Sequence, residues 1–513
     1  MKETPTLLPT PCEARVGLGE LARVAAVMVL LALALYLRTF GADWTYDDWE
    51  FIVNNPDTQS LAGFFADRIP GRPLRDLSVL LDHTLFGLKP AAWHGQNILW
   101  HAFCVVLSWL LVIRLGAGRL VAWGTALLFL VHPLNVEVVA SIAHRKDSLA
   151  LAFSLLALLS WLHSYTVGKG QWSWRLGALL FWLVALQAKQ HVVVLPLLAA
   201  VWEICALPAE KRWLLRWPRV CGFAIVTSIA GFLGWFSFGG GHIRYAETTR
   251  LFLTRWHEYS PDSAGYYPWM VLKSTAFMVS RLVWPTPLAV EYNYPVPHSF
   301  FDPWVMAGAA LFSTFCGLLV IVWRQDRRYF FGLAWFAILW LPTSNLWPLA
   351  YFAADRYFYT PALGLFFCAA LLVASIPGTA GRRRGVLALL IVPLVLLSWQ
   401  QVRIWDNDET LYLHALEVSP KSAYVCNELG KLYDKRGEFQ RAFDYYSRGQ
   451  QNNPREASIP YNLGMLFERR GMYDKALGYY RLFFFLTVDH TGAYAEAARD
   501  LRQRLQKTYG VSY

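Results

Sequence analysis

Two adjacent carboxylates, Asp47 and Asp48, stand just beyond the first long apolar run of the chain. Aromatic residues surround them in the sequence WTYDDWEF, which covers 44–51. A carboxylate held in such a loop can act as a general base that accepts the proton of an attacking hydroxyl. The alternative is structural, with one aspartate capping a turn and the other solvated. We predict Asp47 and Asp48 as catalytic residues.

Further ionisable residues recur between the later apolar runs, and we predict that they bind substrate. They are Arg72, Glu137, Arg145, Lys189, Asp355 and Arg356. Charged groups at membrane depth are costly and usually mark function, although Asp355–Arg356 alone could be a structural salt bridge. Cations stabilise a leaving phosphate, and the planar fork of arginine fits its oxygens. Carboxylates and cations together suit inverting transfer of a sugar from a polyprenyl phosphate to a hydroxyl.

The composition indicates a membrane protein, whose helices must position these residues. The 513 residues are 56% hydrophobic and 16% charged, whereas about 25% charged residues are usual in soluble proteins. The mean hydropathy is +0.31. The net charge of +11 does not require nucleic acid, because clusters of basic residues in short loops serve to orient membrane spans. The seven cysteines show neither a disulfide framework nor metal-ligand spacing.

We predict an all-α protein with about eleven transmembrane helices in residues 1–403. The predicted spans are Leu18–Leu37, Gln96–Leu115, Leu120–Val136, Ser148–Tyr165, Trp174–Ala188, Val192–Ala206, Val220–Phe238, Trp304–Trp323, Phe330–Asn345, Tyr359–Ile376 and Val386–Gln401. Alternate connections are basic, which predicts that they face the cytoplasm. The outer loop 41–93, which carries the acidic pair, and the chain after the last span would then face outward. The N-terminal apolar run is expected to be an uncleaved signal-anchor.

The segment Tyr266–Trp284 tests this topology, because a further crossing there would place two basic loops outside. Lys273, Ser274, Ser280 and Arg281 form a polar stripe on it at helical spacing. We therefore predict an amphipathic helix in the outer membrane interface.

The tail, residues 404–513, contains a repeat. Leu429-Gly430, Tyr433, Gly437, Phe439, Ala442 and Tyr446 recur as Leu463-Gly464, Phe467, Gly471, Tyr473, Ala476 and Tyr480. The offset of 34 (463 − 429) is the tetratricopeptide period. We predict a half-repeat at 404–420, repeats at about 423–456 and 457–490, and a capping helix at 492–507. Such an α-solenoid can bind peptides, although it could also be a purely structural cap.

The order of motifs resembles the transmembrane and tetratricopeptide-repeat O-mannosyltransferases and their bacterial relatives of the C-type glycosyltransferase fold. The similar elements are YDDWEFIVNNPD (46–57), GRPLRDLS (71–78), WHGQNILWH (93–101), HPLNVEVVASIAHRKDSLA (132–150), AKQH (188–191), LPTSNL (341–346), ADRYFYTPALG (354–364) and the tail repeats. Each motif is weak alone, but their order along nearly the whole chain is specific.

The resemblance implies about eleven spans and a catalytic acid in the first external loop. By match, Asp47 and Asp48 correspond to the paired acids of the family, and Arg356 is the leading phosphate-binding candidate. This sequence has Asp355-Arg356 where the family usually has Glu-Arg, and Gln190 follows Lys189 where a glutamate is usual. The resemblance further implies transfer of a lipid-phosphate-linked hexose, typically mannose, to Ser or Thr of proteins.

The expected partners are a polyprenyl-phosphate-linked sugar, a protein or peptide acceptor reached through the repeats, and the lipid bilayer. No nucleic acid and no cofactor are expected, and a divalent metal is left open. Alternatives are the same chemistry on a lipid or glycan acceptor, and a non-enzymatic membrane-anchored repeat scaffold for envelope proteins. A transporter is less favoured, because it would predict internal repeats among the spans. The expected location is a bacterial inner membrane with the tail in the periplasm.

Overall fold

The computed structural model describes residues 16–66, 72–216, 267–293, 295, 297, 299–346, 349, 351–488 and 493–510. Their regular elements are helices, with no β-strand among these residues. The helices before the tail are α1 (Leu18–Tyr36), α2 (Leu61–Ala66), α3 (Pro73–Phe86), α4 (Pro90–Arg114), α5 (Arg119–Val131), α6 (Val136–Ala140), α7 (Arg145–His163), α8 (Gln171–Ala188), α9 (Leu195–Ala206), α10 (Trp213–Arg216), α13 (Tyr267–Val283), α14 (Pro303–Gln325), α15 (Arg327–Trp340), α16 (Ala362–Ser375) and α17 (Ala380–Ile404). The tail forms α18 (Asp408–Val418), α19 (Ala423–Lys435), α20 (Phe439–Asn452), α21 (Ser458–Glu468), α22 (Tyr473–Thr487) and α23 (Ala493–Tyr509).

Several helices are apolar enough to cross a membrane, so the chain is an integral membrane protein. Four are long enough by themselves, at Leu18–Gly41, Pro90–Arg114, Pro303–Gln325 and Ala380–Ile404. A fifth span is possible if Arg119–Val131 and Pro133–Ala140, which meet at a bend of 56°, count as one. Helices occupy all the predicted spans within the described residues, whereas Val220–Phe238 lies outside them.

Helix α13 occupies the segment for which an amphipathic interface helix is predicted. Its polar stripe, however, turns inward, because Lys273 and Ser274 are buried. The Lys273 ammonium donates to Asp302 Oδ2 at 3.0 Å and to Pro295 O at 2.9 Å. Because the carboxylate of Asp302 compensates its charge, Lys273 can be buried against the start of α14. The helical periodicity of the sequence does not reveal this partner.

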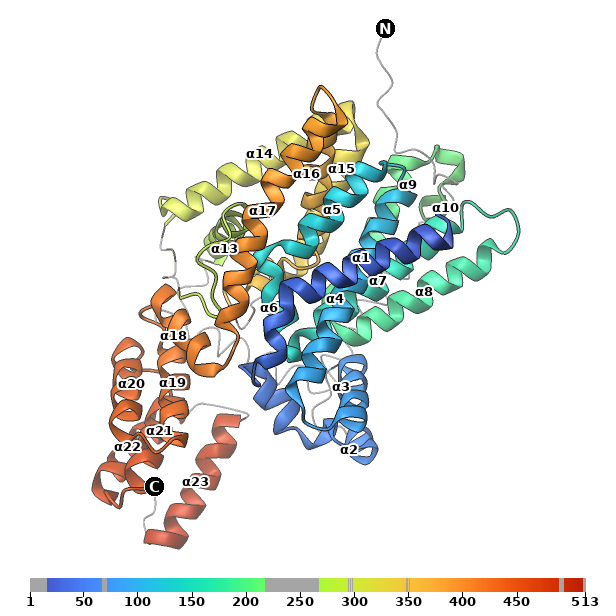
Figure 1. Cartoon of the computed structure of the whole chain (residues 1–513). Helices are drawn as coiled ribbons and strands as arrows, with labels where there is room; N and C mark the ends of the chain where they lie inside the picture. Colours follow the sequence, from blue (N-terminus) through green and yellow to red (C-terminus); the bar gives the residue numbers. More distant parts are fainter. Residues whose placement is uncertain are drawn as a thin grey trace.

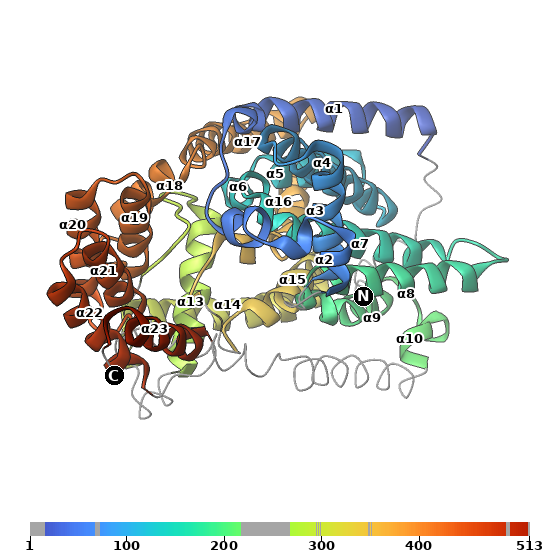
Figure 2. The ribbon, with the colours of Figure 1, turned by 90° about the horizontal axis from the view of Figure 1, so that it is seen from below.

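The loop 41–93 and the tail, which are both predicted to face outward, lie at one end of the helical bundle. Figure 1 shows α2 and α3 at the same end as α18–α23, and Figure 2 shows the same elements from below. Arg38, after α1, forms a bidentate salt bridge with Asp406, at distances down to 2.5 Å. The tail also contacts the segment after α13, where His414 Nε2 lies 2.9 Å from Leu288 O. The tail is thus joined to the loops at this end.

The tail repeats its contacts as well as its sequence. Tyr433 stacks on Tyr445 with ring centroids 5.4 Å apart, and Phe467 stacks on Tyr479 at 5.6 Å. These pairs are related by the offset of 34 residues. The same offset relates Gly430 to Gly464, where an added Cβ would collide with the rings of Tyr446 and Tyr480. Glycine is therefore required at both positions for close packing of the paired helices.

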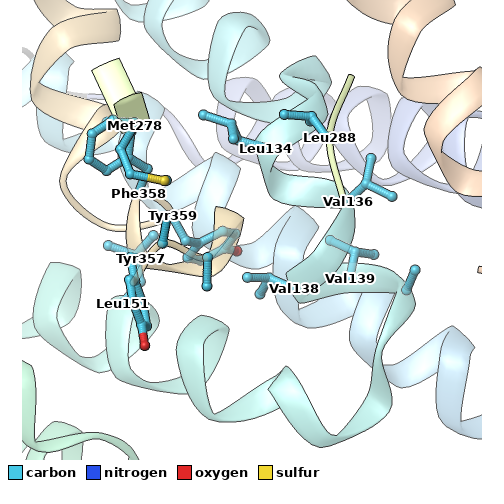
Figure 3. Packing of buried hydrophobic residues seen from close by; sticks show 14 of the residues in the cluster. Leu134, Val136, Val138, Val139, Leu151, Met278, Leu288, Tyr357, Phe358 and Tyr359 are labelled. Atoms are coloured by element: carbon cyan, nitrogen blue, oxygen red, sulfur yellow. The ribbon is translucent and has the colours of Figure 1, made fainter. Parts of the chain in front are cut away.

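A buried apolar core lies beneath the loops at this end. In Figure 3, Leu134, Val136, Val138 and Val139 line one side of it, and Tyr357–Tyr359 come from another segment. These residues come from the 3₁₀ turn Pro133–Asn135, from α6, and from the 3₁₀ turn Asp355–Tyr357 with the two residues after it. The core thereby fixes the two short segments that carry Glu137 and Arg356.

Candidate active site

Asp48, one of the two predicted catalytic residues, is fully buried and joins the loop after α1 to the segment between α6 and α7. Its Oδ1 accepts from Ala143 N at 2.7 Å and from Ser141 Oγ at 3.3 Å. Its Oδ2 accepts from Thr45 N at 3.3 Å. Burial raises the pKa of Asp48 to about 7, although these backbone hydrogen bonds act in the opposite direction. Asp48 thus faces the protein rather than an open space.

Asp47 points the other way, and its side chain is 19% exposed. Its Oδ2 lies 3.2 Å from His144 Nε2 and 4.0 Å from Lys146 Nζ. Burial by itself would raise the pKa of Asp47, but the hydrogen bond from His144 and the charge of Lys146 bring it below its ordinary value. Asp47 is therefore an ionised, accessible carboxylate at neutral pH.

The backbone before Asp47 is held in an uncommon conformation by the tail. Tyr46 has a φ of +56°, a left-handed value that is unusual for a residue with a side chain. Its amide donates to Asp408 Oδ1 at 2.9 Å, and its hydroxyl lies 2.7 Å from that of Tyr351. Asp408 Oδ2 also accepts from Trp49 Nε1 at 2.9 Å. Burial raises the pKa of Asp408 to about 6, against these two hydrogen bonds.

A chain of polar side chains connects Asp47 to the predicted Arg356. His144 Nδ1 lies 3.7 Å from Glu137 Oε1. Glu137 forms a buried salt bridge with Arg356 and also accepts from its backbone amide at 2.9 Å. The guanidinium lies over the ring of Tyr351, 4.8 Å from its centroid. Asp47, His144, Glu137 and Arg356 therefore form one connected group.

The predicted Asp355 lies beside this group but faces elsewhere. It accepts from the Tyr292 hydroxyl at 2.7 Å. Burial and the charge of Glu137 raise the pKa of Asp355 well above its ordinary value. This environment favours a role for Asp355 in supporting the loop.

Two of the predicted cations have carboxylate partners. Lys189 lies 2.5 Å from Asp147 Oδ1. Arg145 lies 2.6 Å from Asp82 Oδ2, donates to Asn97 Oδ1 at 2.7 Å, and is 1% exposed. Because the Arg145 guanidinium is buried and already bonded to protein side chains, its geometry favours a structural role over the predicted binding of substrate.

Arg72 differs from these cations, because it forms no hydrogen bond or salt bridge with any other residue that the structure describes. It precedes α3 directly. Burial and the neighbouring charge of Arg75 lower the pKa of Arg72 to about 10, while Asp147 and Asp47 act against this shift. A guanidinium with unused donors near Asp47 and Asp147 is suited to bind an anion.

Asp47 opens into a cleft of about 650 Å³ between the loop that follows α1 and the tail. Trp49, Glu50 and Asn54 line the loop side, and Tyr424 and Glu428 line the tail side. No cluster of three or more His, Cys, Asp or Glu side chains suited to a metal occurs in the described part of the chain.

The geometry thus brings together most of the predicted residues and adds others. Asp47, Arg72, Glu137, Lys189 and Arg356 lie in or around one site. The prediction omitted His144, Lys146, Asp147 and Asp408. The first three belong to the run HRKD (144–147), which also contains the predicted Arg145, so the sequence could have indicated them as site residues. Asp408 is an ordinary acidic residue after the last span, and nothing near it in the sequence points to the site.

Comparison with known proteins shows similarity to several protein O-mannosyl-transferases. The human protein O-mannosyl-transferase TMTC3 is 26% identical over 495 residues, which are 84% of this chain and 51% of the relative. The mouse TMTC4 is 26% identical over 498 residues, 82% of this chain and 65% of the relative. Human TMTC2 is 34% identical over a shorter stretch of 193 residues, 34% of this chain and 23% of the relative.

These similarities confirm the resemblance predicted from the order of motifs. The chain spans about half the length of the TMTC3 relatives that it matches. No protein-family model matches the chain, and no solved structure matches it.

Proposed function

We propose that this chain, which is similar over most of its length to protein O-mannosyl-transferases, is a membrane glycosyltransferase. It would move a hexose, with mannose favoured, from a polyprenyl-phosphate donor to a hydroxyl of Ser or Thr in proteins. The observation that carries this proposal is the position of Asp47, exposed to a cleft on one side and adjacent to cations on the other.

The proposed reaction is a single displacement. The acceptor hydroxyl attacks the anomeric carbon of the sugar and gives its proton to Asp47. The bond between that carbon and the phosphate oxygen breaks, and the polyprenyl phosphate leaves with the electron pair. Attack opposite the phosphate inverts the anomeric centre, as in inverting glycoside chemistry.

The leaving phosphate would bind the cations on the far side of Asp47. Arg72 has no acceptor among the other described residues, and Lys146 lies 4.0 Å from the Asp47 carboxylate. Arg356 is near enough for its charge to act on Asp47, and the charge of Arg72 acts on Lys189; Lys189 and Arg356 each have a carboxylate partner. Fixed cations of this kind stabilise charge that develops on the phosphate in the transition state.

Arg72→Gln is expected to lower kcat/KM for the lipid-linked donor by about 100-fold, because it removes a preorganised charged donor. Arg72→Lys should recover only part of the loss, since an ammonium lacks the planar fork. Steady-state rates of sugar transfer at varied donor concentration give kcat/KM for both variants. Arg441→Gln, an exposed arginine of α20 that pairs with Glu438, is the matched control. Equal kinetics for Arg72→Gln and Arg441→Gln would contradict the assignment.

The proposed architecture retains about eleven transmembrane helices and a tetratricopeptide solenoid in residues 404–513. The repeated stacking and glycine contacts at an offset of 34 residues support the solenoid. By the positive-inside rule the site and the tail would face away from the cytoplasm. That side would be the periplasm at a bacterial inner membrane, or the lumen at the endoplasmic reticulum.

Asp408 is proposed as a positioning residue for the loop that carries Asp47. In Asp408→Asn one oxygen becomes an NH₂ donor, so either Tyr46 N or Trp49 Nε1 loses its acceptor. Loss of such a hydrogen bond to a charged group costs about 1.5 kcal/mol, or about tenfold in rate if it acts on the transition state. We expect kcat to fall about tenfold with an unchanged KM for donor. Asp474→Asn, on the exposed surface of α22, should leave kcat unchanged, and an equal effect of both changes would exclude a positioning role.

The proposed function is tested with membranes that contain the full chain and polyprenyl-phosphate mannose labelled in the sugar. The expected result is label in protein that mild alkali releases, as expected for sugar linked to Ser or Thr. Label confined to lipid or glycan would retain the chemistry but change the acceptor. Membranes that transfer no more label than those lacking the chain would contradict the function and favour a non-enzymatic repeat scaffold.

A further inference from the structure

The cleft in front of Asp47 has one wall from the first outer loop and one from the tail. Trp49 and Asn54 belong to the loop, whereas Tyr412 and Tyr424 belong to α18 and α19. Its volume of about 650 Å³ falls within the range of about 300–1,000 Å³ of sites for drug-sized ligands. The cleft can therefore admit a short segment of chain, but not a folded domain.

The chemistry of the walls suits an extended polypeptide. Asparagine amides can both donate to and accept from a peptide backbone, and the exposed Asn54 lines the loop side. Tyrosine and tryptophan rings provide large contact surfaces at a small cost in side-chain entropy. The walls thus combine polar groups with aromatic surface, as suits the backbone and side chains of a peptide.

The charge of the cleft is strongly asymmetric. Five carboxylates line it, Asp47, Glu50, Asp57, Asp408 and Glu428, against Lys431 and Lys435, which gives −3 (2 − 5) when all are ionised. Both lysines are engaged: Lys431 lies 2.7 Å from Glu428 Oε1, and Lys435 lies over Trp49, 5.4 Å from its ring centroid. Glu50 is exposed and forms no ion pair with another described residue.

The charges around Glu50 also shift its pKa. Partial desolvation and the charge of Asp47 raise its pKa, and Glu428 acts in the same direction, whereas Lys431 and Lys146 lower it. A cation placed between the loop and α19 would relieve this repulsion. The cleft therefore favours an occupant that brings positive charge.

We propose that the cleft binds an extended segment of the acceptor polypeptide and selects segments with Lys or Arg close to the reactive hydroxyl. This inference rests on the proposed function, since it is the acceptor hydroxyl that would reach Asp47. Glu50 and Glu428 determine the selectivity from opposite walls, one on the loop and one on the tail.

The test measures binding of fluorescent peptides to the purified full chain in detergent, without a sugar donor. One peptide has a single serine flanked by lysines, and the other has glutamates at the same positions. We expect the wild type to bind the lysine peptide about tenfold more tightly at low salt, with a preference that falls as salt rises. Glu50→Gln and Glu428→Gln should each reduce the preference about threefold.

Glu496→Gln, an exposed carboxylate of α23 outside the cleft, is the matched control and should keep the full preference. Thermal unfolding of each variant verifies that it is folded. Equal affinity of the wild type for both peptides would overturn the inference, and so would an undiminished preference in the Glu50→Gln/Glu428→Gln double variant. Transfer of labelled sugar is measured separately, so selective binding without transfer would contradict only the proposed function.

Discussion

Replacement of Asp47 by Asn is expected to lower the rate of sugar transfer about 10³-fold, within the range usual for loss of a general base. The amide cannot accept the proton of the acceptor hydroxyl, so the loss should appear in kcat while the KM for donor changes little. Asn is nearly isosteric and can still accept from His144 Nε2. The measurement is transfer of labelled mannose at saturating donor, with equal amounts of folded protein.

The adjacent Asp48 provides the sharpest comparison. Because it is buried against Ala143 and Ser141, Asp48→Asn should retain activity within about tenfold, since its amide oxygen can still accept from both. The reverse pattern, with activity retained in Asp47→Asn and lost in Asp48→Asn, would assign the base to Asp48. Activity in both variants would exclude a carboxylate base from this pair.

The second large effect concerns stability. Glu137→Gln is expected to lower the free energy of unfolding by about 3–5 kcal/mol, because it leaves the buried Arg356 without its counter-charge. Thermal unfolding in detergent measures this loss. The matched control is Glu20→Gln, which removes the partner of the exposed Arg119 and should change stability little.

A double substitution of Glu137 and Arg356 separates the effect of charge on stability from the effect of packing. In Glu137→Leu/Arg356→Met, no uncompensated charge remains, and apolar replacement of a buried pair is often nearly neutral. We expect the double variant to be more stable than Glu137→Gln, although inactive. Equal melting temperatures for Glu137→Gln and Glu20→Gln would show that the Glu137–Arg356 pair adds nothing to stability.

The sequence allowed the helical architecture to be predicted, because its signals are local. Long apolar runs predict the helices between Leu18 and Ile404, and an offset of 34 residues predicts the paired helices of the tail. The polar stripe of α13 shows the limit of this reasoning. Its periodicity was informative, but the partner that buries it, Asp302, lies beyond the helix.

The site could be predicted only as a set of candidates. The direction in which Asp47 and Asp48 point depends on the left-handed backbone of Tyr46, which Asp408 supports from 362 positions away. Arg145 and Arg72 likewise look equivalent in sequence. The contacts of Arg145 with Asp82 and Asn97 distinguish it from Arg72, which has no acceptor in the described part of the chain.

The proximity of Lys146 to Asp47 couples the basicity of the carboxylate to the binding of the donor phosphate. The charge of Lys146 helps to keep the pKa of Asp47 low, so an anion that binds Lys146 weakens that influence and makes Asp47 more basic. By linkage, a proton on Asp47 strengthens binding of the same anion by an equal factor. The carboxylate is thus a poor proton acceptor while the phosphate position is empty and a better one when it is filled. Such coupling makes Asp47 a stronger base once the donor is bound, and it retains the lipid phosphate until the proton departs.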